Sequence, residues 1–146
     1  MSKTFTVLKG LAASFKQPTG RSRPGIDWAI EITGEPSGMV VFKSTGRVHL
    51  MHDAEIYWCE AVGNYVRVHA AAGTYVVRST LRHLEHQLRA ARFVRVHRST
   101  VVNVDVIRDL RATTNGDYMI TLRDDTALTL SRGYRDAFER AIGHLL

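Results

Sequence analysis

Residues 93–103 of this chain read FVRVHRSTVVN. Two runs rich in aromatic and β-branched residues, 93–96 and 100–104, flank a polar break at His97, Arg98 and Ser99. Such runs favour β-strands, and a polar break between them favours a tight connection. The stretch therefore predicts two short strands, with the Arg98 cation presented outward where the first strand ends.

Similar short β-rich segments fill most of the remaining sequence, separated by turn residues such as Gly63-Asn64 and Asn115-Gly116. They cover residues 39–43, 47–51, 56–61, 65–70, 74–78, 106–111, 118–122 and 127–130. Apolar residues at helical spacing predict one internal helix over 80–88 and one C-terminal helix after Ser131. This order predicts a mainly β fold and lacks the strand–helix alternation of a parallel nucleotide-binding sheet.

Residues 1–38 differ from this pattern. Apolar residues from Phe5 to Phe15 recur at helical spacing, and residues 17–25 concentrate Pro, Gly and Ser as a linker does. Residues 26–32 alternate apolar and polar side chains, which predicts one added strand within 26–33. We therefore expect an N-terminal extension over residues 1–38 and a folded domain over residues 39–146.

The composition excludes several classes of protein. The chain has 146 residues, of which 45% are apolar and 23% charged, as in an ordinary globular protein. No stretch reaches the roughly 18 consecutive apolar residues of a membrane-spanning helix, and the N-terminus lacks a secretory signal pattern. We therefore expect a cytoplasmic protein without a membrane span. The single cysteine, Cys59, excludes an intramolecular disulfide.

The charge distribution indicates a surface that faces a polyanion. Lys and Arg number 20 against 14 Asp and Glu, a formal net charge of +6, and all but four of the cations are arginine. Seven arginines and a single acid, Glu85, lie between residues 64 and 100. Arginine presents a planar fork of donors that suits phosphates and guanine edges. On charge alone, a merely solvated arginine-rich face explains the pattern equally well.

Other chemistry has weaker support. Cys59, His97 and Asn103 are the residue types of a thiol hydrolase, but Cys59 lies in an apolar run, which favours a buried thiol. Two histidine pairs have three-residue spacing but no acidic or cysteine partner at fixed spacing, which favours solvated histidines over a metal site. These pairs are His49 with His52 and His83 with His86. Glycine-rich phosphate loops are missing. We therefore expect a protein that is not an enzyme and uses neither a metal nor a cofactor.

The run from Ile56 to Tyr134 resembles the LytTR family of bacterial DNA-binding domains. The matching motifs, in order, are IYWCEA at 56–61, GNYV at 63–66, VRSTL at 77–81, FVRVHRS at 93–99, VVN at 101–103 and LSRGY at 130–134. The resemblance implies an elongated stack of small antiparallel sheets that lies along one face of a DNA duplex, with loops entering two successive major grooves. Many members carry a receiver domain ahead of this one, and 38 residues are too few to form it.

The resemblance also implies, position by position, which residues contact DNA. The base-contacting residues would be Arg98, Arg132, Asn64 and Tyr65. The phosphate-contacting residues would be Arg67, Arg78, Arg95, His97, Ser99 and Arg135. An arginine in the major groove favours guanine, and residue 98 is Asn in some relatives, so the preferred site should differ from theirs. For His97, a packed and hydrogen-bonded position at the strand end is the favoured alternative.

Arg132 is notable because it follows the expected N-cap Ser131. A cation there meets the positive end of a helix dipole, which indicates an external anion unless the side chain is simply solvated. The leading hypothesis is a transcription regulator that binds repeated sites in double-stranded DNA, with two molecules forming a dimer on one face. Residues 1–38 would contact a regulatory protein partner or a second copy. The alternative is an RNA-binding or protein-interaction β domain that uses the same arginine-rich face.

Overall fold

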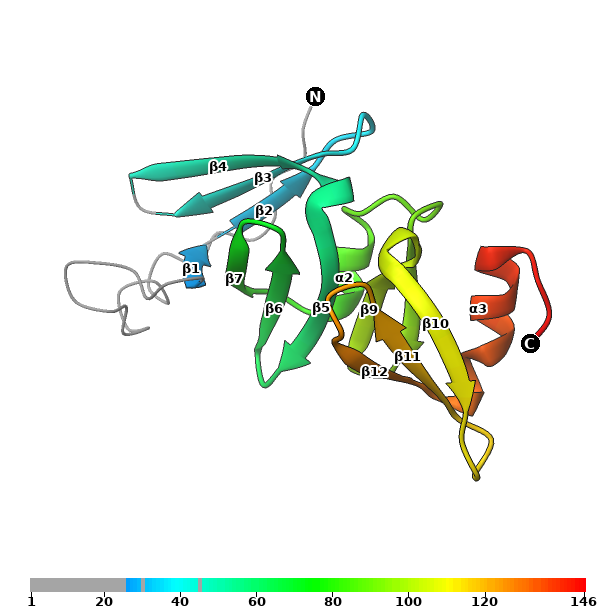
Figure 1. The fold of residues 1–146 in the computed structure, drawn as a ribbon. Coiled ribbons are helices and arrows are strands. Elements are labelled where there is room, and N and C mark those ends of the chain that lie inside the picture. The colour runs from blue at the N-terminus through cyan, green and yellow to red at the C-terminus, as the bar shows by residue number, and fades with distance from the viewer. Residues whose placement is uncertain (1–25, 30, 45) are drawn as a thin grey trace.

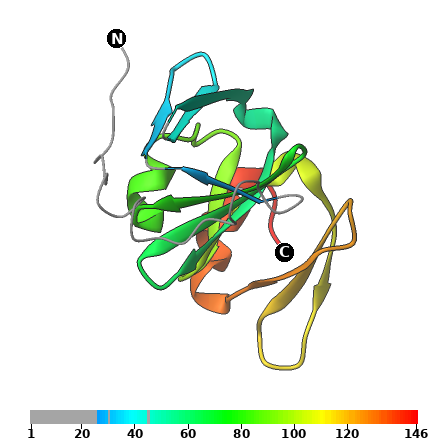
Figure 2. The ribbon, with the colours of Figure 1, turned by 90° about the vertical axis from the view of Figure 1, so that its left-hand side faces the viewer.

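A computed structural model describes residues 26–29, 31–44 and 46–146. Its strands form one six-stranded sheet between two three-stranded sheets, as Figure 1 shows from upper left to lower right. The three sheets and two helices confirm the predicted mainly β stack, and Figure 2 shows the same arrangement from the side.

The six-stranded sheet is the centre of the molecule. Its strand order is β1-β7-β6-β5-β9-β8. The bounds are β1 (Ile26–Ala29), β7 (Gly73–Arg78), β6 (Tyr65–Ala70), β5 (Ile56–Val62), β9 (Thr100–Asn103) and β8 (Phe93–His97). Every pair is antiparallel except β1 with β7, which is parallel and departs from the all-antiparallel expectation.

The two smaller sheets are antiparallel throughout. One contains β2 (Glu31–Gly34), β3 (Met39–Ser44) and β4 (Arg47–His52). The other contains β10 (Ile107–Ala112), β11 (Tyr118–Leu122) and β12 (Ala127–Leu130). Short 3-10 turns join sheets at η1 (Asp53–Glu55) and η2 (Val104–Val106). These turns let the chain leave one sheet and enter the next within three residues.

Both helices are shorter than predicted. The internal helix α2 (Leu81–Glu85) begins after Thr80, whose hydroxyl accepts a 3.0 Å hydrogen bond from the His83 amide. It ends before residue 88 because residues 86–88 make i→i+3 bonds, although Leu88 remains buried. The C-terminal helix α3 (Arg135–Ile142) starts late because residues 132–134 form the 3-10 turn η3 (Arg132–Tyr134).

Two hydrophobic cores lie on opposite faces of β8 and β9. The first contains Phe93 and Val101 and packs against α2 and the sheet of β2, β3 and β4. The second contains Val94 and Val102 and packs against β11, β12 and α3. Alternating side chains of a strand point to opposite faces, so this short hairpin contributes to both cores. It thereby joins all three sheets.

The predicted single strand over 26–33 is wrong. The segment forms two strands in different sheets, since β1 pairs with β7 while β2 pairs with β3. A regular alternation of apolar and polar residues indicates which residues are extended. It does not indicate where the chain leaves one sheet and enters another. The predicted helix near Phe5 to Phe15 and the linker over 17–25 lie outside the described residues.

A buried carboxylate links the β4 end to the connection before β8. Asp53 is 1% exposed and accepts two hydrogen bonds from Arg89, from Nε and Nη2, each 2.8 Å. The Arg92 Nε lies 3.4 Å from the same carboxylate. Burial raises the pKa of Asp53, but the hydrogen bond and charge of Arg89, with the charge of Arg92, outweigh it and hold the pKa below its usual value.

We expect Asp53→Asn to lower the free energy of unfolding at pH 7 by about 1–3 kcal/mol, because a buried charged pair loses one partner while both arginines keep partial access to water. A carboxyl whose pKa is lowered by folding stabilises the protein above its unfolded pKa, and this stabilisation is lost as pH falls through the folded value. Urea unfolding should therefore show a smaller difference between wild type and variant at pH 3 than at pH 7. Asp105→Asn, which changes an exposed partner of Arg92, is the control and should cost less. Equal losses in both variants would contradict this assignment.

Candidate nucleic-acid interface

The topology brings three connections together where several strands of the central sheet begin or end. Val62 lies opposite Tyr65, Tyr65 opposite Arg78, and Glu60 opposite Thr100. The β5–β6 turn, the end of β7 and the β8–β9 connection therefore meet at the edge that faces downward in Figure 1. This edge, defined by residues 62–65, 78–83 and 97–99, is called the basic edge below.

Backbone hydrogen bonds hold the β8–β9 connection between its neighbours. The Ala61 amide donates to the Ser99 carbonyl at 2.9 Å, which ties the connection to the end of β5. The Ser131 amide donates to the Val96 carbonyl at 2.9 Å, which ties it to the segment before η3. Arg132 follows Ser131 directly, so its backbone lies close to the end of β8, which leads into the connection that carries Arg98.

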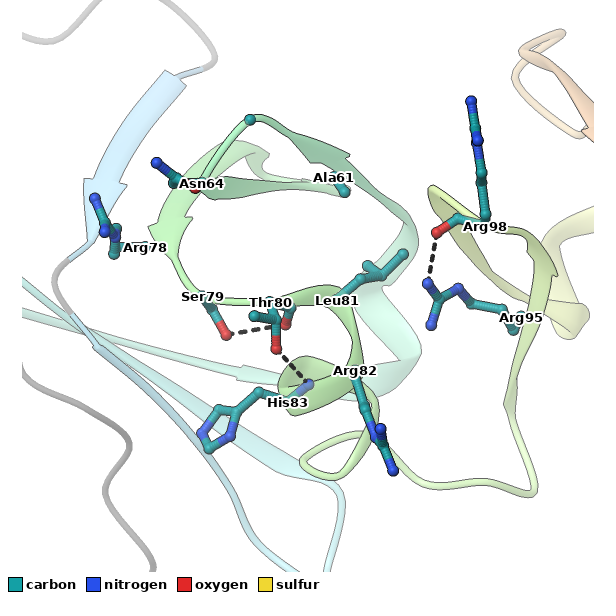
Figure 3. A pocket seen from close by; sticks show the side chains of 11 residues that line it. Ala61, Asn64, Arg78, Ser79, Thr80, Leu81, Arg82, His83, Arg95 and Arg98 are labelled. Atoms are coloured by element: carbon teal, nitrogen blue, oxygen red, sulfur yellow. Dashed lines mark hydrogen bonds between the residues drawn. The ribbon is translucent and has the colours of Figure 1, made fainter.

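A hollow of about 580 Å³ lies in the basic edge between these connections (Figure 3). Arg78, Arg82, Arg95 and Arg98 line it, and its lining contains no carboxylate. Asn64, Ser79 and Thr80 add polar groups from the turn and from the start of α2. A concave surface with several cations and no acid attracts an anionic partner and suits phosphate oxygens.

Four of the ten predicted contact residues line this hollow, namely Asn64, Arg78, Arg95 and Arg98. Asn64 and Arg98 are exposed at turns, and the Arg98 side chain extends away from Arg95 in Figure 3. Gly63 has a φ of +60°, a left-handed conformation that glycine adopts readily, so it forms the tight turn that presents Asn64. The Arg78 guanidinium lies 5.7 Å from the centre of the Tyr65 ring.

Hydrogen bonds between His97 and Ser99 restrain the β8–β9 connection. The His97 Nδ1 accepts a hydrogen bond from the Ser99 amide at 3.2 Å and lies 2.9 Å from the Ser99 hydroxyl. Both side chains are half-buried. The expected packed and hydrogen-bonded position of His97 agrees with this geometry. Its imidazole shapes the turn that exposes Arg98.

The remaining predicted residues lie at the margins of the basic edge or beyond it. Arg132 is exposed, and its amide donates to Asp117 at 2.9 Å. Arg135 donates a 3.0 Å hydrogen bond to Glu139 and lies over the Tyr118 ring, and this hydrogen bond and the charge of Tyr118 raise the pKa of the guanidinium. Arg67 projects from the middle of β6, 3.4 Å from Glu60.

Sequence reasoning missed two residues of this site. Arg82 lines the hollow from the first turn of α2; the charge pattern placed it in the arginine-rich segment, but it was not among the ten predicted contact residues. Glu85 pairs with Arg95 at 2.8 Å, whereas the sequence analysis counted it only as an isolated acid. The signal for both was present, because the arginine-rich segment 64–100 contains them, but the pairing requires the fold.

The alternative chemical sites have little geometric support. Cys59 is fully buried in the first core, and burial raises the pKa of its thiol, which disfavours the reactive thiolate. Among the residues that the structure describes, no cluster of three or more His, Cys, Asp or Glu could hold a metal ion. In the same part of the chain, no helix is long and apolar enough to cross a membrane.

Comparison with known proteins identifies the family. The family model for the LytTr DNA-binding domain matches residues 46–143, and the chain belongs to this family. A solved LytTr DNA-binding domain from Bacillus cereus shares the fold, with a TM-score of 0.65 and 24% identity over 73% of this chain and 97% of that one.

Two curated relatives show the same similarity in sequence. The sensory transduction protein LytR of Staphylococcus epidermidis is 26% identical over 97 residues, 66% of this chain and 38% of the relative. The sensory transduction protein LytT of Bacillus anthracis is 29% identical over 93 residues, 64% of this chain and 38% of the relative. The matched segment thus spans less than half the length of these relatives.

We expect Cys59 to resist alkylation in the folded protein because its side chain is buried and its thiolate is disfavoured. Iodoacetamide at pH 8 followed by mass spectrometry should leave the native chain unmodified over the time in which the urea-unfolded chain reacts completely. Rapid labelling without urea would show that this part of the first core opens to solvent.

Proposed function

We propose that this protein is a sequence-specific regulator of transcription that binds double-stranded DNA through the basic edge. The observation that supports it best is the hollow lined by four arginines, one of which, Arg95, is paired with Glu85, within a domain of the LytTr family. A fixed array of cations binds the DNA backbone through release of counterions, and exposed side chains beside it read base edges. The activity needs no catalytic group, metal or cofactor.

Arg98 and Arg132 are the proposed base-reading residues. Both are exposed, and both belong to segments held by the hydrogen bonds at Ser99 and Ser131. A guanidinium in the major groove donates two hydrogen bonds to O6 and N7 of guanine. Asn64 at the neighbouring turn, with Tyr65 beside it, is the third proposed reading position. Because these positions come from separate connections, we infer that they enter successive major grooves.

The phosphate-contacting residues fall into two groups. Arg78 lines the hollow and Arg67 is exposed on β6, so both are accessible to a DNA backbone. Ser99 and His97 lie at the connection, where the Ser99 hydroxyl would have to leave Nδ1 of His97 to reach a phosphate, whereas Nε2 of His97 takes no part in that contact. Arg95 and Arg135 have carboxylate partners at 2.8 and 3.0 Å, closer than the 3.4 Å between Arg67 and Glu60, and both are less exposed than Arg67. We therefore assign most of the phosphate contact to Arg78 and Arg67.

Repeated binding sites follow from the size of the interface. One domain offers three reading positions, which specify few base pairs, whereas two copies on one face of the duplex double the contact area. We propose that two molecules bind as a dimer on repeated half-sites. Their spacing would be a whole number of helical turns, about 10 base pairs each, because only then do both copies meet the same face.

Selection of bound duplexes from a random DNA pool at about 150 mM salt tests this proposal, since non-specific phosphate binding is weak at that ionic strength. The wild-type protein should enrich one repeated motif. Arg98→Ala and Arg132→Ala should each lose discrimination at a separate base position, by roughly 1–3 kcal/mol per lost bidentate contact. Arg67→Ala is the control, because loss of a phosphate contact weakens binding to all sequences alike.

An identical motif from both arginine variants would overturn the assignment of reading residues. Enrichment of no motif by the wild-type protein would overturn sequence-specific DNA binding. A polyanion such as RNA, or a protein partner, would then be the better explanation of the basic edge.

We propose that residues 39–146 form the DNA-binding unit and that residues 1–38 support it and contact a partner or second copy. A chain that begins at Gly38 should select the same DNA motif. It should unfold at lower temperature because it loses β1, β2 and the fully buried Ile32, and its monomer–dimer equilibrium should shift. Calorimetry and sedimentation measure these changes, and Ile32→Ala in the full chain is the control for core loss alone. Unchanged stability and association in the shortened chain would refute both roles.

A further inference from the structure

We propose that Glu85 and Arg95 are positioning residues for DNA reading, and that together they hold the backbone from which Arg98 projects. The inference rests on the proposed function, because it assumes that Arg98 reads a base. It gives Arg95 a role other than phosphate contact. It also gives Glu85, an acid in an otherwise basic segment, a reason to be there.

The Arg95 guanidinium makes three contacts at once. Its Nε donates to the His97 carbonyl at 3.0 Å, its Nη2 donates to the Arg98 carbonyl at 2.5 Å, and its Nη1 donates to Glu85 Oε1 at 2.8 Å. Figure 3 shows the contact with the Arg98 carbonyl. One planar group thus fixes two consecutive carbonyls. This arrangement, in which Arg95 is held by Glu85 and binds the carbonyls of His97 and Arg98, is called the clamp below. The planar fork of arginine suits this geometry, and a lysine ammonium cannot reproduce it.

The alternation of β8 explains why Glu85 is the anchor. Phe93 packs in the first core against α2, while Val94 and Val96 pack in the second core. Arg95 therefore leaves β8 on the same face as Phe93, toward α2. Glu85 is the last residue of α2 and meets it there. Both side chains are about two-thirds to three-quarters covered, with 25% of Arg95 and 32% of Glu85 exposed, so water only partly screens the pair.

The contacts leave Arg95 poorly suited to DNA phosphates. Three of its donor groups are already used within the protein, and Glu85 offsets its charge. The Cα atom of Arg98 lies between the two fixed carbonyls, those of His97 and Arg98 itself, while the Arg98 side chain stays exposed. A reading side chain must be held within about 0.5 Å to keep its discrimination, so a fixed backbone at Arg98 contributes directly to specificity.

The test combines Arg95→Lys, Glu85→Ala and Glu85→Gln with Arg82→Ala as the matched control. Arg82 lines the same hollow, so its removal subtracts one positive charge near the clamp without touching Glu85 or the two carbonyls. Binding to the selected motif and to single-base variants of it is measured at two salt concentrations. Thermal unfolding of each variant shows whether it is folded.

We expect Arg95→Lys and Glu85→Ala to lose about tenfold in discrimination at the base position assigned to Arg98, with discrimination at the Arg132 position unchanged. Glu85→Gln keeps an acceptor oxygen and should restore part of the loss. Arg82→Ala should weaken binding to all sequences alike and lower the salt dependence. A purely structural role would instead lower discrimination at both base positions in proportion to lost stability.

The opposite result identifies Arg95 as a phosphate contact and overturns the proposal. In that case Arg95→Lys keeps most of the affinity, and both Glu85 variants bind every sequence more tightly because a repelling charge is gone. Unchanged discrimination at the Arg98 position in folded Arg95→Lys would overturn it as well.

Amide hydrogen exchange in the DNA-free protein separates this proposal from the proposed function. If the clamp is real, the Arg98 and Ser99 amides exchange faster in Arg95→Lys than in the wild type, whether or not Arg98 reads DNA. Faster exchange together with an Arg98→Ala variant that keeps its motif would refute base reading but keep the clamp. Unchanged exchange would refute the clamp alone.

Discussion

The pairing of β5 with β9 is the contact on which the interface depends. Strand β5 is followed along the chain by β6, β7 and α2 before the chain returns at β8 and β9, and the pairs Trp58 with Val102 and Glu60 with Thr100 set where that return is fixed. The buried Asn103 amide reinforces it by donating to the Ile56 carbonyl at 2.9 Å. A slip of one residue would turn Val101 and Val102 to the wrong cores and carry Arg98 away from Asn64.

The interface thus derives its rigidity from interior packing. Strands β8 and β9 contribute side chains to both cores, so the connection between them cannot move without disturbing one core or the other. Hydrogen bonds from Ala61 and Ser131 restrain the same connection on two sides, and the side chains of Arg95 and His97 restrain it from within. The exposed turn that carries Arg98, a proposed reading residue, is therefore restrained from several sides.

Much of this fold could be predicted from short-range patterns. Alternation located β6, where Val66 and Val68 are buried while Arg67 is exposed, and the FVRVHRSTVVN stretch located the β8–β9 hairpin. Long-range choices could not be predicted. Nothing near Ile26–Ala29 indicates a parallel partner 48 residues further along the chain, and nothing in the sequence of α2 indicates that Glu85 meets Arg95. Residue types at the site were predictable, whereas their division into exposed and internally paired arginines required the tertiary structure.

The parallel pairing of β1 with β7 has a consequence for how the protein behaves in a crowded cell. Without β1, the six residues of β7 would present an open row of amides and carbonyls at the margin of the central sheet, a template on which another chain can add a strand. With β1 in place, the outermost strand at this margin of the sheet is only four residues long. A strand this short offers few backbone groups to which another chain could add a strand. Strand β1, which precedes the matched residues 46–143, thus shortens the open row of backbone groups at this margin of the sheet that carries the proposed reading residues.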